Sequence, residues 1–78
     1  MKKKIIILGS TGSIGSTVLN LIKKQKYNVI LLSASNNIKK LLQQSIKHNS
    51  KFAVIENEYL YKKYFNLFKR KKIKLFYG

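Results

Sequence analysis

The sequence lacks cysteine and proline and contains very few acidic residues. The absence of cysteine excludes a disulfide framework, a cysteine-ligated zinc site and a thiol nucleophile. One histidine and two glutamates, Glu56 and Glu58, are too few to build a metal site from protein side chains alone. No apolar run approaches the roughly 20 residues that cross a membrane. The apolar run at residues 5–8 is also shorter than the roughly 7–15 residues of a secretory signal, so we predict a cytoplasmic protein without membrane contact.

The charge is strongly one-sided, because 17 basic residues against 2 acidic ones give a net charge of +15. Such an excess is typical of proteins that bind nucleic acid or anionic membranes. It also arises without such a partner, because Lys, Ile, Asn, Tyr and Phe, all with A/T-rich codons, make up more than half of the sequence. We favour this second interpretation and predict no specific nucleic-acid partner.

The 78 residues suffice for one small domain, in which apolar runs of two kinds alternate. Continuous runs predict strands at residues 4–8, 28–33, 51–55 and 73–77, the first of them buried on both faces. Between them, helical spacing predicts three apolar helix faces: Ile14, Val18, Leu21 and Ile22; Ile38, Leu41, Leu42 and Ile46; and Leu60, Tyr61, Tyr64, Phe65 and Phe68. The order β-α-β-α-β-α-β predicts an α/β fold, a partial Rossmann-like doubly wound parallel sheet of four strands and three helices.

A glycine-rich loop joins the first strand to the first helix, with the sequence Gly9-Ser10-Thr11-Gly12-Ser13-Ile14-Gly15. In this position such loops bind the pyrophosphate of a dinucleotide. Gly9 would permit a sharp turn, Gly12 a close approach of backbone to pyrophosphate, and Gly15 close packing of helix on strand. The N–H groups of residues 12–14 and the hydroxyls of Ser10, Thr11 and Ser13 would face the anion. A plain glycine-rich turn is the simpler alternative, but it would not need three glycines at this spacing.

The segment after the second strand indicates which dinucleotide to expect. An NAD site places Asp or Glu here, about 20 residues after the loop, to bind the ribose hydroxyls. This segment is Ser33-Ala34-Ser35-Asn36-Asn37, which contains no carboxylate, and Lys39 and Lys40 follow it. Hydroxyls, amides and a nearby ammonium can receive a 2′-phosphate, so the segment favours NADP(H). Asn36 or Asn37 also suits the N-cap of the second helix, as Asn57 does for the third.

The glycine-rich loop resembles the N-terminal signature of the 1-deoxy-D-xylulose 5-phosphate reductoisomerase family. Leu32-Ser33-Ala34 followed by Asn37, and the later Lys51-Phe52-Ala53-Val54, extend the resemblance over essentially the whole chain. The resemblance implies an oxidoreductase of non-mevalonate isoprenoid synthesis, which forms 2-C-methyl-D-erythritol 4-phosphate using NADPH and Mg²⁺ or Mn²⁺. It implies NADPH contacts at these positions: Thr11, Gly12, Ser13, Ile14, Ser35, Asn36 and Asn37.

The sequence departs from the family in two ways. Ser35 replaces a common glycine and Asn36 a common lysine or arginine, so Lys39 or Lys40 would have to supply the cation for a 2′-phosphate. Family members are several hundred residues long, and their acidic metal ligands match nothing here. Glu56 and Glu58 instead suit the start of the third helix.

We therefore expect residues 1–78 to be the first part of a dinucleotide-binding domain, either a fragment of a longer enzyme or the product of a truncated gene. We expect no catalytic and no metal-binding residues, and no activity of the chain alone. Substrate binding would need later domains, and the homodimer of the family would depend on later segments.

Two other functions remain open at this point. The first is another NADP-dependent Rossmann oxidoreductase, such as a member of the aspartate-semialdehyde dehydrogenase family, to which residues 10–14 fit less well. The second is a basic nucleic-acid-binding module. No signature of the common nucleic-acid-binding folds is present, and the aromatic residues gather on the apolar face of the third predicted helix.

Overall fold

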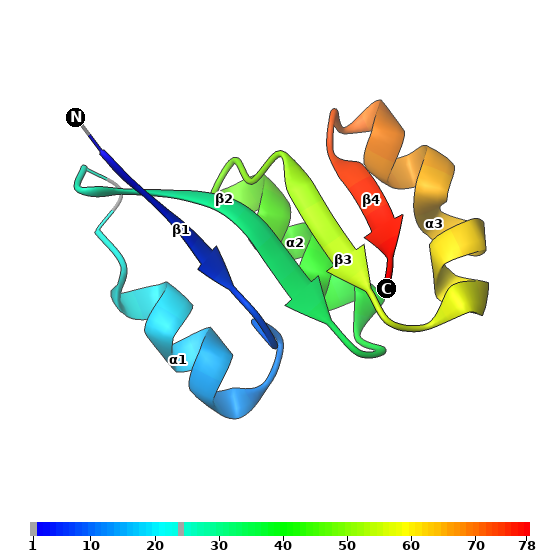
Figure 1. Ribbon diagram of the computed structural model, residues 1–78, viewed down its shortest axis with the longest axis horizontal. Helices are drawn as coiled ribbons and strands as arrows, with labels where there is room; N and C mark the ends of the chain where they lie inside the picture. The colour runs from blue at the N-terminus through cyan, green and yellow to red at the C-terminus, as the bar shows by residue number, and fades with distance from the viewer. Residues whose placement is uncertain (1, 24) are drawn as a thin grey trace.

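The computed structural model describes residues 2–23 and 25–78, which form four strands and three helices. In chain order these are β1 (Lys3–Ile7), α1 (Ser13–Leu21), β2 (Tyr27–Ala34), α2 (Ile38–Lys47), β3 (Phe52–Ile55), α3 (Glu58–Arg70) and β4 (Lys74–Tyr77). The strands adjoin in chain order and every neighbouring pair is parallel (Figure 1). The predicted α/β fold is confirmed, and the strand bounds differ from the predicted ones by no more than one residue.

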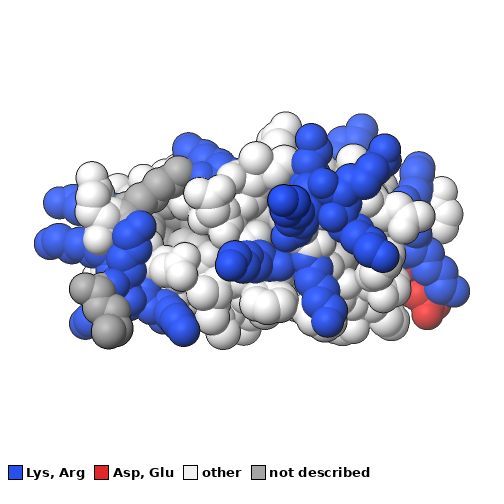
Figure 2. Space-filling model, turned by 90° about the horizontal axis from the view of Figure 1, so that it is seen from above, with Lys and Arg blue, Asp and Glu red and all other residues white. Residues whose placement is uncertain are grey.

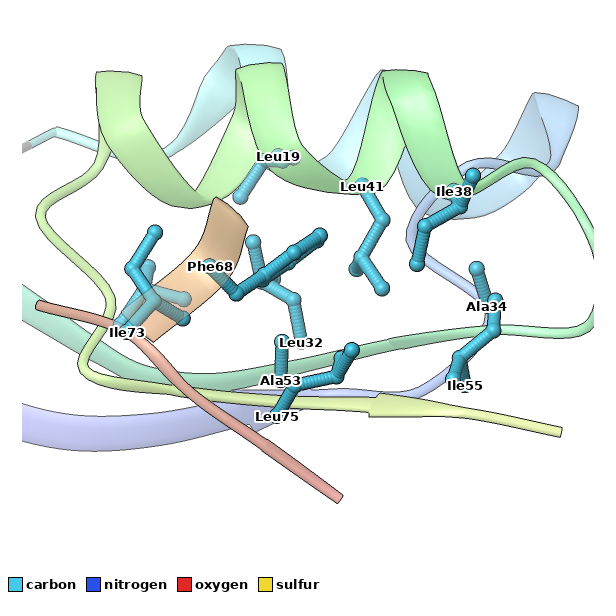
Figure 3. Close-up of a cluster of buried hydrophobic side chains, with 11 residues drawn as sticks. Leu19, Leu32, Ala34, Ile38, Leu41, Ala53, Ile55, Phe68, Ile73 and Leu75 are labelled. Carbon is cyan, nitrogen blue, oxygen red and sulfur yellow. The ribbon is translucent and has the colours of Figure 1, made fainter. Parts of the chain in front are cut away.

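All three helices contribute to one hydrophobic core on a single face of the sheet. Leu19 of α1, Leu41 of α2 and Phe68 of α3 are each at most 1% exposed and meet above the strands (Figure 3). From the sheet, the core includes Val29, Leu32, Ala34, Ala53, Ile55 and Leu75. Right-handed crossovers between strands added in one direction place every helix on the same side, which explains this arrangement.

The opposite face of the sheet is open in the part of the chain that the structure describes. Phe52 and Phe76 lie side by side on it, with ring centroids 6.2 Å apart. Ile5 and Ile7 pack against the core, whereas Ile6 between them is 55% exposed. The prediction that the first strand is buried on both faces is therefore wrong here, because β1 is an edge strand with one uncovered face.

Helix α1 turns a different side toward the core than its apolar spacing predicts. Leu19 and Ile22 pack into the core, whereas Ile14 is 80% exposed and Leu21 75% exposed. The predicted stripe of Ile14, Val18 and Leu21 therefore does not face the sheet. Ile14 and Val18 instead form an apolar surface alongside the open edge of β1.

The ends of α2 and α3 are fixed by backbone and side-chain caps. The Asn37 side chain accepts a hydrogen bond from the Lys40 N–H, so Asn37 is the cap of α2 out of the two predicted candidates, Asn36 and Asn37. The Asn57 side chain accepts one from the Leu60 N–H, which confirms the predicted cap of α3. Each helix then ends in a left-handed residue, Asn49 with φ 53° and Lys72 with φ 61°. The N–H of the next residue bonds back to the last turn of the helix in both cases, which is the Schellman arrangement.

Basic side chains cover much of the end of the sheet at which the strands begin (Figure 2). Lys3, Lys51 and Lys74 lie at the starts of β1, β3 and β4, and Lys71 and Lys72 lie in the turn before β4. This end is opposite the loop that leaves β1. No described helix is long and apolar enough to cross a membrane.

Candidate functional site

The glycine-rich loop leaves the carboxyl end of β1 in a tight, closely packed turn. Gly9 has a φ of +67°, a conformation that other residues rarely adopt, which confirms the predicted sharp turn. A Cβ on Gly15 would lie 2.2 Å from the carbonyl oxygen of Gly9. The predicted role of Gly15, close packing of the helix on the chain leaving the strand, is therefore confirmed.

Gly12 is the N-cap of α1, and its N–H is already used within the loop. This N–H donates to the Gly9 carbonyl at 3.1 Å, so the expectation that it faces an anion is wrong. The next two N–H groups, of Ser13 and Ile14, belong to the first turn of α1, where helical N–H groups have no acceptor within the helix. No side chain caps this end and its first turn contains no acidic residue, so it keeps its preference for an anion.

Ser10 points into the protein instead of toward a phosphate. It is fully buried, and its hydroxyl donates to the Ser33 carbonyl at 3.3 Å. Its N–H donates to the same carbonyl at 2.9 Å, while the Ser33 hydroxyl accepts from the Gly9 N–H at 2.9 Å. The prediction that the Ser10 hydroxyl donates to a bound anion is therefore wrong, because this hydroxyl donates to the Ser33 carbonyl of β2.

Helix α2 supports the loop from the side. The Gln44 side chain donates to the Ser10 carbonyl at 2.8 Å, and the Lys40 ammonium donates to the Thr11 carbonyl at 3.1 Å. Lys40 therefore places its charge at the glycine-rich loop. The sequence placed Ser33 in the segment expected to receive a 2′-phosphate, but it did not predict the bonds of Ser33 to the loop, and it did not single out Gln44. Only the predicted adjacency of β1, β2 and α2 could have suggested these contacts.

An open groove runs beside the loop, with a volume of about 530 Å³. Gly9, Gly12, Ser13, Ile14 and Gly15 line one part of it, and the remainder is apolar, from Ile6 to Leu8 and Val18. The exposed residues Gly12 and Ser13 border the groove directly. A Cβ added to Gly12 would lie 3.4 Å from the Gly9 carbonyl oxygen. The groove thus combines a polar helix start with an apolar wall, a combination typical of small-molecule sites.

The second candidate region follows β2, at the same edge of the sheet as the loop. Ser35 and Asn36 are exposed, and each bonds to the loop that follows β3. The Ser35 hydroxyl donates to a Glu56 carboxylate oxygen at 2.7 Å, and the Asn57 amide donates to the Asn36 side-chain oxygen at 3.0 Å. Glu56 was expected at the start of the third helix, but it precedes α3 and turns toward Ser35 instead. Asn37 uses its side-chain oxygen as the α2 cap.

The residues present fit part of a dinucleotide and do not fit a metal. The loop, the uncapped start of α1 and the end of β2 lie together at the carboxyl edge of neighbouring parallel strands, where such ligands bind. Among residues 2–23 and 25–78, no three His, Asp or Glu side chains come close enough to hold a metal ion.

Comparisons with known proteins agree with this arrangement. A family model described as 1-deoxy-D-xylulose 5-phosphate reductoisomerase matches residues 5–78. The curated enzyme of that name from Wolbachia pipientis subsp. Culex pipiens is 45% identical over 62 residues, covering 77% of this chain and 16% of the relative. The one from Porphyromonas gingivalis is 43% identical over 63 residues, covering 78% of this chain and 16% of the relative.

A solved structure of the same family also matches this chain. It is the 1-deoxy-D-xylulose 5-phosphate reductoisomerase from Zymomonas mobilis in complex with NADPH, with a TM-score of 0.92 and 32% identity. The match covers 100% of this chain and 21% of that one, so the chain spans about a fifth or less of the length of these relatives. From the loop sequence, the fold and these matches, the chain belongs to the 1-deoxy-D-xylulose 5-phosphate reductoisomerase family.

Proposed function

We propose that this chain binds the adenosine and pyrophosphate portion of NADPH. The observation that carries the proposal is the glycine-rich loop, which turns at Gly9 and presents an uncapped helix start at Gly12 beside an open groove. NADPH, when bound, supplies the hydride of the family's reduction. The residues of this chain would bind and orient the nucleotide end of the cofactor.

In this proposal the pyrophosphate lies over the start of α1. The N–H groups of Ser13 and Ile14 donate to it, the hydroxyls of Thr11 and Ser13 add donors, and the Gly12 backbone approaches it closely. Lys40, held at the Thr11 carbonyl, adds a positive charge beside the same phosphates. Lys40 would therefore favour NADPH and NADH equally.

The adenosine ribose would lie at the end of β2, against Ser35, Asn36 and Asn37. The amide groups of Asn36 and Asn37 can donate to a 2′-phosphate, whereas the Ser35 hydroxyl donates to Glu56. The exposed Lys39 in the first turn of α2 is a candidate for the cation. The support for this region is its position at the end of the second strand, where Rossmann folds bind the ribose.

The experiment is a calorimetric titration of NADPH and NADH into the chain and its variants at Gly12. Gly12→Asp introduces a carboxylate at the anion site, and we expect it to weaken both cofactors by more than about tenfold. Aspartate is also a favoured N-cap residue and Gly12 has an ordinary φ of −73°, so this variant should retain its fold and melt no lower than the wild type. Gly12→Ala is the control for the added Cβ alone. Undiminished binding by Gly12→Asp, or no saturable binding by the wild type, would contradict the proposal.

The wider proposal is that the chain acts as the first part of a cytoplasmic, homodimeric reductoisomerase. Conversion of 1-deoxy-D-xylulose 5-phosphate needs a divalent metal, for which the described residues offer no site. We therefore expect the 78-residue chain alone to give no metal-dependent NADPH oxidation with this substrate and Mg²⁺ or Mn²⁺. A rate above that of a control without protein would contradict this expectation.

A further inference from the structure

Glu56 brings one of the two carboxylates of the chain to the predicted ribose region. It comes directly after β3, whose last residue, Ile55, pairs with Ala34 at the end of β2. The Glu56 N–H donates to the Ala34 carbonyl at 3.1 Å, which extends the sheet by one residue. This backbone bond fixes Glu56 beside Ser35, and the carboxylate accepts the Ser35 hydroxyl at 2.7 Å.

This hydrogen bond changes what Ser35 can offer to a ligand. A serine hydroxyl has a single O–H to donate. While that O–H points to Glu56, it is not available to a 2′-phosphate, and the phosphate would meet a carboxylate within a few ångströms of the same oxygen. A free ribose 2′-hydroxyl has the opposite chemistry, because it can donate to the Ser35 oxygen or to the carboxylate.

The neighbouring contact shows that the arrangement belongs to the whole loop. The Asn57 amide donates to the Asn36 side-chain oxygen at 3.0 Å, while the Asn57 oxygen caps α3. Two successive residues after β2 are thus bound by two successive residues after β3. Asn57 holds the loop as a neutral amide, so the charge of Glu56 is not needed for that purpose.

We infer that Glu56 is a specificity-determining residue that weakens the preference for NADPH over NADH. From the position directly after the third strand, it supplies the carboxylate that NAD sites place at the end of the second. The inference rests on the proposed function, because it assumes that the ribose lies at Ser35. Its content is separate: it concerns the ratio of the two affinities, not the existence of the site.

The test is a titration of NADPH and NADH into the wild-type chain and two variants. Glu56→Gln keeps the shape of the side chain and removes its charge. Glu58→Gln removes the other negative charge of the chain, two residues further along in the exposed first turn of α3, and is the matched control. Adenosine 2′,5′-bisphosphate and 5′-AMP, titrated in the same way, isolate the 2′-phosphate from the rest of the cofactor.

We expect Glu56→Gln to tighten NADPH and the bisphosphate by about three- to tenfold, the range for a single repulsion between a carboxylate and a partly screened phosphate. NADH and 5′-AMP should bind as before or more weakly, and Glu58→Gln should leave all four ligands within about twofold of the wild type.

An unchanged ratio of NADPH to NADH affinity in Glu56→Gln would overturn the inference. So would an equal loss of both cofactors, since this would make Glu56 only a support for the loop. If the wild type binds NADPH and NADH but the ratio does not move, only this inference fails. If it binds neither, the proposed function fails as well.

Discussion

Replacing Gly15 by alanine tests the packing on which the glycine-rich loop depends. Gly15 lies in the first turn of α1, where exchanging glycine for alanine ordinarily stabilises a helix by about 1 kcal/mol. Here the new Cβ would lie 2.2 Å from the Gly9 oxygen, 2.9 Å from the Gly9 carbonyl carbon and 2.9 Å from the Ser10 Cα. All three are backbone atoms in a turn whose geometry is fixed by hydrogen bonds to β2. The clash therefore cannot be relieved by rotating a side chain.

Overpacking of this kind costs about 1–3 kcal/mol, which exceeds the gain in helix propensity. The net loss is up to about 2 kcal/mol, which lowers the Tm of a domain of this size by up to roughly 16 °C. The assay is thermal unfolding followed by circular dichroism, with Gly12→Ala as the control. A Cβ on Gly12 meets the Gly9 oxygen at 3.4 Å, an ordinary contact, so that variant should melt within a few degrees of the wild type. A higher Tm for Gly15→Ala than for the wild type would refute the close-packing argument.

Three further predictions address the fold and the charge. Lys72→Gly should raise the Tm by about 2–8 °C, because Lys72 has a left-handed φ of 61° and glycine would relieve about 0.5–1 kcal/mol of backbone strain. Lys71→Gly should not raise the Tm, because Lys71 has an ordinary φ of −88°. Phe68→Ala should cost about 3–5 kcal/mol by emptying the centre of the core, and a chemical denaturation curve without a folded baseline at 25 °C would agree with this for so small a domain. Binding to duplex DNA should be weak and should fall steeply between about 50 and 200 mM salt; sequence-selective binding that survives the higher salt would favour the nucleic-acid interpretation instead.

The sequence was sufficient to predict the features that depend on neighbours along the chain. Continuous apolar runs predict all four strands, because the strands of a parallel sheet are themselves continuous runs of apolar residues. The caps at Asn37 and Asn57 act within one turn of their own helices and were predicted for the same reason. Gly9 and Gly15 contact each other and are only six residues apart, so their roles were also predictable from the local sequence.

The features that the sequence did not predict depend on distant parts of the chain. The i, i+4, i+7 spacing of Ile14, Val18 and Leu21 identifies an apolar face of α1, but it does not say which surface that face meets. Only the position of β1 at the sheet edge explains why Leu19 is buried instead. Glu56 reaches Ser35 across 21 positions and Gln44 reaches Ser10 across 34, so the spacing of residue types gives no sign of either contact.

The central claim, that the nucleotide end of NADPH binds across the glycine-rich loop and the end of β2, is tested most directly by an NMR titration. NADPH is added to the isotopically labelled chain, and the shifts of the backbone amides are followed to saturation. We predict that the shifting amides are those of residues 9–15 and 33–37, with the largest changes at Ser13 and Ile14, whose N–H groups would donate to the pyrophosphate. Saturable shifts confined to the lysine-rich end of the sheet, around residues 51 and 71–74, would contradict the claim, as would a spectrum that NADPH leaves unchanged.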